Sequence, residues 1–113
     1  MISLRRRRQR EPRLSLVLVI YRMSDQADRT LQSLSPPYQQ AVDTADYEVI
    51  VIENASTDEL GRQRAERHGD HIRYYHREET LPSPVPAARY GVGQSRADLL
   101  ALCIDGARMA TPG

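Results

Sequence analysis

Residues 14–21 read Leu14-Ser-Leu-Val-Leu-Val-Ile-Tyr21, a nearly continuous apolar run rich in branched side chains. Such a run is typical of a strand that is buried on both faces, as in a parallel sheet. The pattern returns in Tyr47-Glu-Val-Ile-Val-Ile52 and in Leu99-Leu-Ala-Leu-Cys-Ile104, which we expect to be buried like the first run. Ile72-Arg-Tyr-Tyr-His76 alternates weakly and predicts a shorter strand between these two.

The segments after the first two strands have helical patterns. Ser24 or Asp25 can cap a first helix, and Ser35-Pro36-Pro37 ends it because proline cannot continue a helical hydrogen-bond ladder. The apolar residues between them share one helix face: Ala27, Leu31 and Leu34. Ser56-Thr-Asp-Glu59 is a capping box, which predicts a mostly polar, exposed helix that begins at Ser56 and ends near Gly69.

A third helix is expected between the last two strands. Pro86 suits a first helical turn, and the helical pattern runs from Ala87 to about Ala97. Glycine disfavours a helix interior, so Gly91 and Gly93 indicate close packing against a neighbouring element.

The alternation of strands and helices predicts an α/β fold. Right-handed crossovers then give a parallel sheet with helices on both faces, and ligands in such sheets bind beyond the carboxyl ends of the strands. Polar residues follow three of these ends, namely Tyr21, Arg22, Glu53, Asn54 and Asp105. We therefore expect a binding site at this edge of the sheet.

The composition fits one small soluble domain. The chain has 113 residues, of which 40% are apolar and 27% are charged, and it has no apolar run of the ~18 residues that a membrane helix needs. Its single cysteine, Cys103, excludes an internal disulfide framework and a multi-cysteine zinc site. These features favour a cytoplasmic location.

The charge is divided unevenly along the chain. Residues 1–13 hold six arginines and one acid, whereas the following hundred residues hold ten arginines and fourteen acids. The first segment is either a solvated, disordered tail or an anchor through Arg5, Arg6, Arg7 and Arg8 to anionic lipid at the inner membrane surface. Because the body is acidic, no nucleic-acid partner is expected.

Four stretches of residues 14–113 resemble family 2 glycosyltransferases with the GT-A fold. Ile52-Glu-Asn-Ala-Ser-Thr-Asp58 resembles the V-D-N-G-S-T-D turn of that family, and Leu18-Val-Ile-Tyr-Arg22 resembles I-P-T-Y-N. Ala87-Ala-Arg-Tyr-Gly-Val92 resembles A-x-N-x-G-V. Arg96-Ala-Asp98 is similar to the R-G-D that precedes the D-x-D strand, here Leu99 to Asp105. The resemblance implies a Rossmann-like GT-A half-domain with four mainly parallel strands in the order 3-2-1-4.

The resemblance implies that a nucleotide-diphospho-sugar binds at the strand ends. Glu53 occupies the position of the acid that contacts the base or ribose, and the ring of Tyr21 could flank the base. Arg22 and Asn54 stand beside them in the sequence and belong to the same expected site. Each of these two residues has a structural alternative to ligand contact. Glu53 could be an acid that the helix dipole favours at the start of a helix, and Tyr21 could be an ordinary, partly buried tyrosine.

The D-x-D position departs from the family, because it reads Asp105-Gly106-Ala107-Arg108 and lacks the second acid. Asp105 alone could hold Mn²⁺ or Mg²⁺, and only together with the nucleotide. Arg108 could neutralise diphosphate charge in place of metal, or it could be a surface arginine.

The resemblance implies the donor-binding portion of an inverting glycosyltransferase, which ends after the D-x-D position. We expect this portion to transfer no sugar alone, because no acceptor-side base can be named. The alternative is a non-catalytic nucleotide-sugar-binding or regulatory module, which the missing acid favours. His68, His71 and His76 are expected at the surface.

Overall fold

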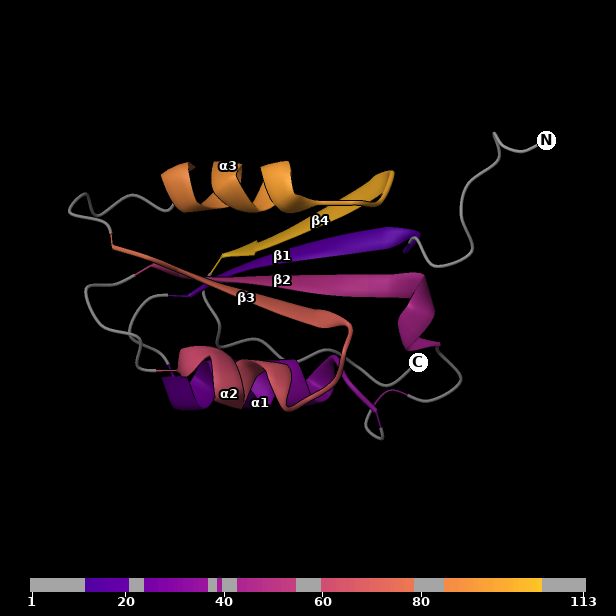
Figure 1. Ribbon diagram of the computed structural model, residues 1–113, viewed down its shortest axis with the longest axis horizontal. Helices are drawn as coiled ribbons and strands as arrows, with labels where there is room; N and C mark the ends of the chain where they lie inside the picture. Colours follow the sequence, from indigo (N-terminus) through magenta and orange to yellow (C-terminus); the bar gives the residue numbers. More distant parts are fainter. Residues whose placement is uncertain are drawn as a thin grey trace.

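Four parallel strands form the central sheet of the computed structural model, in the order β3-β2-β1-β4 (Figure 1). The structure describes residues 12–20, 24–36, 39, 43–54, 60–78 and 85–104. The strands are β1 (Leu14–Ile20), β2 (Tyr47–Asn54), β3 (Ile72–Arg77) and β4 (Leu99–Ile104). This arrangement confirms the predicted parallel α/β sheet and its order 3-2-1-4.

Helices cover both faces of the sheet. They are α1 (Ser24–Ser33), α2 (Gly61–Glu66) and α3 (Val85–Gln94), and a short 3₁₀ helix, η1 (Thr44–Asp46), precedes β2. Figure 1 shows α1 and α2 together below the sheet and α3 above it. This division follows from right-handed crossovers, in which the direction of the step along the sheet decides the face on which the helix lies. The chain steps in one direction from β1 to β2 and from β2 to β3, and it steps in the opposite direction from β3 to β4.

The strand residues alternate between two cores. Leu18, Ile20, Val49 and Val51 pack on the α1/α2 side, together with the predicted face residues of α1. Val17, Val19, Ile50 and Ile52 pack on the α3 side. Because β1 and β2 are central and covered on both faces, their sequences are apolar at nearly every position.

Gly91 lets α3 approach the sheet closely. A Cβ atom there would overlap Cγ1 of Val17 and lie 3.3 Å from Cγ1 of Ile52. The predicted close packing is therefore confirmed for Gly91. It is wrong for Gly93, where nothing lies within 4 Å of an added Cβ, because this residue faces outward.

Two sequence predictions about the strands and helices need correction. The fourth strand is not buried like the first, since Leu99, Leu100 and Leu102 are exposed; β4 lies at the edge of the described sheet. The second helix begins at Gly61 rather than at Ser56, and the predicted capping box lies outside the described residues.

The prediction that all three histidines lie at the surface is wrong for His71. This residue is buried, its Nε2 lies 3.0 Å from the Ser35 hydroxyl, and its ring packs on Tyr47 with centroids 5.0 Å apart. Burial disfavours the charged imidazolium and lowers the pKa of His71 below its usual 6.5.

The contrast between the two glycines of α3 gives a stability prediction. We expect Gly91→Ala to lower the free energy of unfolding by about 1–3 kcal/mol, because the added methyl group overpacks the α3 core. Gly93→Ala is the matched control and should be neutral or stabilise by up to about 1 kcal/mol, because it only improves helix propensity. Urea denaturation measures both. Equal effects of the two substitutions would contradict the close approach at Gly91.

Candidate functional site

The carboxyl ends of the strands meet at one edge of the sheet, which we call the carboxyl edge. Its described ends are Ile20, Asn54, Arg77 and Ile104. In the strand register, Ile20 pairs with Glu53, Asn54 pairs with Arg77, and Ile104 pairs with Val19 next to the end of β1. The edge predicted to carry the polar strand ends is therefore a single surface.

Of the residues predicted for the site, the structure describes Glu53 and Asn54. Tyr21, Arg22, Asp105 and Arg108 lie outside the described residues, as does Ala107. In the sequence, Tyr21 follows the last residue of β1 and Asp105 follows the last residue of β4.

Glu53 points to the α1/α2 side, where its carboxylate is fully buried. Oε2 accepts a hydrogen bond of 2.8 Å from the backbone N–H of Leu60, and Oε1 accepts one of 3.2 Å from the N–H of Gly61. The hydroxyl of Tyr74 donates to Oε1 as well. Glu53 therefore accepts hydrogen bonds at the start of α2, as expected if it is a helix-entry acid rather than a ligand contact. Ligand contact by Glu53 stays a prediction.

Asn54 points to the opposite side, toward α3. Successive residues of a strand face opposite sides of the sheet, so Asn54 shares its side with Ile52 of the α3 core. Its side chain is 5% exposed, and Oδ1 is buried with no hydrogen-bond partner among the residues that the structure describes. A buried amide oxygen without a partner costs free energy that a donor on a ligand would recover.

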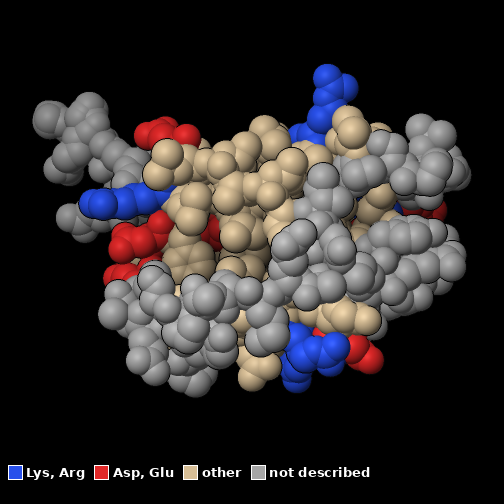
Figure 2. Space-filling view, turned by 180° about the vertical axis from the view of Figure 1, so that it is seen from behind, with Lys and Arg blue, Asp and Glu red and all other residues tan. Residues whose placement is uncertain are grey.

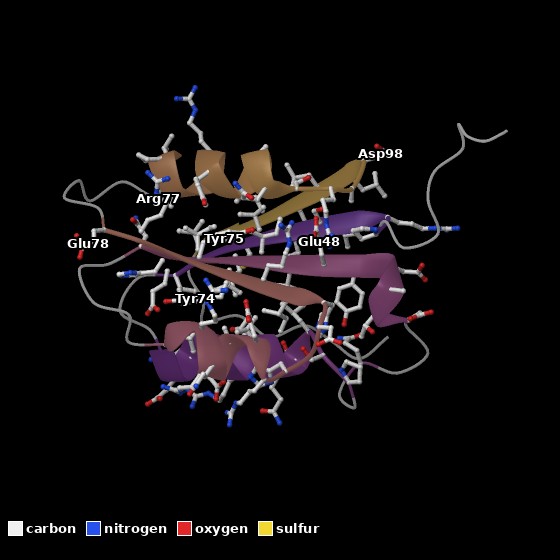
Figure 3. The ribbon with its side chains drawn as sticks, viewed as in Figure 1. Glu48, Tyr74, Tyr75, Arg77, Glu78 and Asp98 are labelled. Carbon is white, nitrogen blue, oxygen red and sulfur yellow. The ribbon has the colours of Figure 1, made fainter. Side chains whose placement is uncertain are left out.

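Arg77 and two tyrosines lie on this same side of the sheet. The guanidinium of Arg77 stands 4.8 Å from the ring centroid of Tyr90 on α3. Tyr90 meets Tyr75 edge to face, with centroids 5.4 Å apart. Figure 3 shows Arg77 and Glu78 at the carboxyl edge, and it shows Tyr75 and Tyr74 on opposite sides of β3. Arg77 and Tyr90 were not among the predicted site residues, although Arg77 directly follows the strand predicted at residues 72–76.

Asn54, Arg77 and Tyr90 together offer three kinds of contact. An amide both accepts and donates hydrogen bonds, as a nucleobase edge requires, and a guanidinium pairs with phosphate oxygens. An aromatic ring offers a face for stacking. Within the described ranges, no three His, Cys, Asp or Glu side chains gather in a group that could hold a metal ion.

A second polar cluster lies at the amino end of the sheet, around Glu48 (Figure 3). Oε1 of Glu48 accepts hydrogen bonds of 2.9 Å from Nη2 of Arg73 and of 3.0 Å from Nε of Arg96. Oε2 accepts one of 2.8 Å from the Arg96 N–H, and another from the hydroxyl of Ser15. That hydroxyl in turn accepts from the N–H of Ala97, at 3.1 Å. The cluster therefore joins three strands to the connection between α3 and β4.

The partners of Glu48 keep its carboxylate ionised although it is buried. Burial by itself raises the pKa of Glu48. Hydrogen bonds from Ser15 and from the Arg96 backbone, and the charge of Arg73, outweigh burial and hold the pKa below 4.5. Because every partner belongs to the fold and the cluster lies at the end opposite the carboxyl edge, we assign Glu48 a structural role. An acid inside an apolar strand was the sequence signal for it.

Comparison with models of known protein families gives no match, and no curated protein matches the sequence. The resemblance to family 2 glycosyltransferases therefore depends on the four stretches quoted above. None of the described helices is long and apolar enough to cross a membrane.

Removing the charge of Glu53 should destabilise the fold. In Glu53→Gln, an N–H₂ group replaces one of the two carboxylate oxygens. At the Oε2 position it would face the N–H of Leu60, and at the Oε1 position it would face the N–H of Gly61 and the hydroxyl of Tyr74, so at least one donor loses its acceptor. We expect a loss of about 1–3 kcal/mol in the free energy of unfolding. Thermal or urea unfolding measures it, with the exposed Glu78→Gln as the control. Unchanged stability would mean that the carboxylate does not hold α2.

The Glu48 cluster predicts an acid-dependent stability. The folded-state pKa of Glu48 is lowered, so its stabilising contribution is fully present above the unfolded value of about 4.5 and is lost as the pH falls through the folded pKa. We expect Glu48→Gln to be less stable than the wild type at neutral pH, and the difference to shrink below about pH 4.5. Urea unfolding at several pH values measures this, with the exposed Asp98→Asn as control. A difference that does not change with pH would contradict the assignment.

Proposed function

We propose that this chain is the nucleotide-diphospho-sugar binding portion of an inverting glycosyltransferase. The observation that carries the proposal is the 3-2-1-4 order, because it makes the ends of β1, β2 and β4 neighbours at the carboxyl edge. These are the ends that the family resemblance associates with the donor. The four resembling stretches supply the chemistry, and the fold supplies a common edge for them.

We propose that Asn54 contacts the nucleobase. Its carboxamide oxygen has no partner within the described ranges and can accept a hydrogen bond from the ring N–H of a uracil or guanine, whereas the Glu53 oxygens already accept three hydrogen bonds. Tyr21 follows the end of the neighbouring strand and is proposed to flank the base.

The charge of the diphosphate is proposed to be met mainly by arginine. Arg77 supports this role because it is paired with Asn54 in the strand register, and Arg22 and Arg108 are close to strand ends in the sequence. Asp105 would contribute one carboxylate to Mn²⁺ or Mg²⁺ that arrives with the nucleotide. Because Ala107 replaces the second acid, we expect the nucleotide affinity to depend little on metal.

A second candidate function is a non-catalytic nucleotide-sugar-binding or regulatory module. The observation that favours it is the missing second acid at Ala107. Both candidates share the donor site, and they differ in whether a chain that includes an acceptor side transfers sugar. For either of them we propose a cytoplasmic location, with peripheral membrane contact through the arginine run at residues 5–8.

Calorimetric titration with uridine and guanosine diphosphates tests the donor site. We expect the wild type to bind one of them, and Asn54→Ala to weaken binding about tenfold, as loss of one buried hydrogen bond does. Gln63→Ala, at an exposed position of α2, is the control and should bind like the wild type. Titrations with Mn²⁺ and with a chelator should agree closely. If neither nucleotide binds, the proposed function is wrong; if binding is unaffected by Asn54→Ala, only the role of Asn54 is wrong.

A further inference from the structure

A row of contacting side chains lies between β3 and α3 and runs from the Glu48 cluster to the carboxyl edge. Arg73, Tyr75 and Arg77 are alternate residues of β3, so they share the α3 side of the sheet. Tyr90 joins the row from α3, where it contacts Tyr75 and Arg77. Figure 3 shows Glu48, Tyr75 and Arg77 in this order along the sheet. The row therefore connects a structural cluster with a residue of the proposed binding site.

The hydroxyl of Tyr75 is held at the end of the row that is nearer the Glu48 cluster. It accepts a hydrogen bond of 3.0 Å from Nη1 of Arg73 and donates one of 3.3 Å to Oε1 of Gln94. Nη2 of Arg73 donates in turn to Oε1 of Glu48, at 2.9 Å, and to the backbone carbonyl of Gln94, at 2.5 Å. Because both partners of the hydroxyl are tied to each other and to the sheet, they favour one orientation of the Tyr75 ring.

The ring of Tyr75 supports Tyr90, and Tyr90 supports Arg77. The two rings meet at 76°, with centroids 5.4 Å apart, which is a favoured edge-to-face geometry. The Arg77 guanidinium lies over the Tyr90 ring at 4.8 Å from the centroid, within the range of a cation–π contact. An arginine side chain has many rotamers, and a ring held in a fixed place favours those rotamers that keep the guanidinium over it.

The position of Arg77 matters because of where charge is found on the described surface. In Figure 2, which views the molecule from behind, uncharged side chains fill the middle of the described surface and charged ones lie toward its margins. No described arginine shows in the middle of that face to meet a diphosphate. At the carboxyl edge, by contrast, Arg77 is paired in the strand register with Asn54, the proposed contact of the nucleobase.

We propose that Tyr75 is a positioning residue, which holds the Arg77 guanidinium ready for the diphosphate by fixing the ring of Tyr90. The inference rests on the proposed function, in which Arg77 meets the charge of the diphosphate. Without Tyr75, Tyr90 loses the neighbouring ring that fixes its tilt, and the guanidinium loses a fixed surface. A group that is already in place binds more tightly, because it loses less conformational freedom on binding.

Packing and positioning predict different results when substitutions are combined. If Tyr75 only stabilises the α3 core, its removal weakens nucleotide binding by the same factor whatever stands at residue 77. If Tyr75 acts through Arg77, its removal has no further effect once Arg77 is replaced, since residues that act through one another are not additive. The effect of removing Tyr75 should persist when Asn54 is replaced, because Asn54 contributes a separate contact.

Titrations with uridine and guanosine diphosphates, followed by NMR chemical shifts, test this coupling. For the diphosphate that the wild type binds, Tyr75→Leu should raise Kd about fivefold, as loss of one aromatic pair does. The same change should raise Kd about fivefold in Asn54→Ala, and less than about twofold in Arg77→Gln. An unchanged Kd in Tyr75→Leu, or an equal rise of Kd in the Arg77→Gln background, would overturn the proposal.

Two further variants separate the ring contact from a general loss of structure. Tyr75→Phe keeps the ring next to Tyr90 and should stay within about twofold of the wild-type Kd. Tyr47→Leu is the matched control, since it removes a tyrosine ring at the start of β2, where Tyr47 packs on His71, and it should bind like the wild type. Circular dichroism checks that each variant is folded. If Tyr75→Phe binds as weakly as Tyr75→Leu, or if Tyr47→Leu weakens binding equally, the ring of Tyr75 does not position Arg77.

A measurement without ligand distinguishes failure of this proposal from failure of the proposed function. In the NMR spectrum of the wild type, the ring current of Tyr90 should move the δ-methylene protons of Arg77 upfield, and Tyr75→Leu should reduce that shift. A wild type without the shift, or a shift that Tyr75→Leu leaves unchanged, would mean that the positioning role is wrong. If the shifts behave as expected and neither nucleotide binds, the proposed function is wrong instead.

Discussion

The buried carboxylate of Glu48 is the interaction on which the arrangement of the sheet depends. It accepts hydrogen bonds from β1 through Ser15, from β3 through Arg73, and from the α3–β4 connection through Arg96. A buried charge costs free energy unless each of its acceptor sites is used, so the cluster favours one relative position of these segments over others. It holds the α3–β4 connection at the amino end of β1, where β4 begins with Leu99 paired to Leu14.

The strand order 3-2-1-4 determines which side chains the carboxyl edge can offer. Neighbouring residues at the end of β2 face different layers, because side chains alternate along a strand. Glu53 enters the layer of α1 and α2 and holds the start of α2, whereas Asn54 enters the layer of α3 beside Arg77. Glu53 therefore supports the fold, whereas the Oδ1 atom of Asn54 has no hydrogen-bond partner in the described part of the chain. The different surroundings of these two side chains favour the proposed binding site on the α3 side of the carboxyl edge.

The edge strand β4 shows how an interior type of sequence can lie at a surface. Its apolar run resembles that of β1, yet β1 has neighbours on both sides and β4 has β1 alone within the described sheet. Hydrophobic residues that would be covered in the middle of a sheet are thus exposed at its edge.

The sequence by itself determined the strands, the α/β class and the edge at which the polar strand ends meet, because apolar runs, helix spacing and handed crossovers are local or general rules. Only the tertiary structure decided that His71 is buried and that β4 is exposed. It also decided that Glu53 points toward α1 and α2 whereas Asn54 points toward α3. The alternation of side chains along a strand predicts which residues share a face of the sheet, but it does not predict which helix covers that face. The partners of Glu48 were also beyond a sequence reading, since Arg96 is far from it along the chain and meets it only after the sheet has formed.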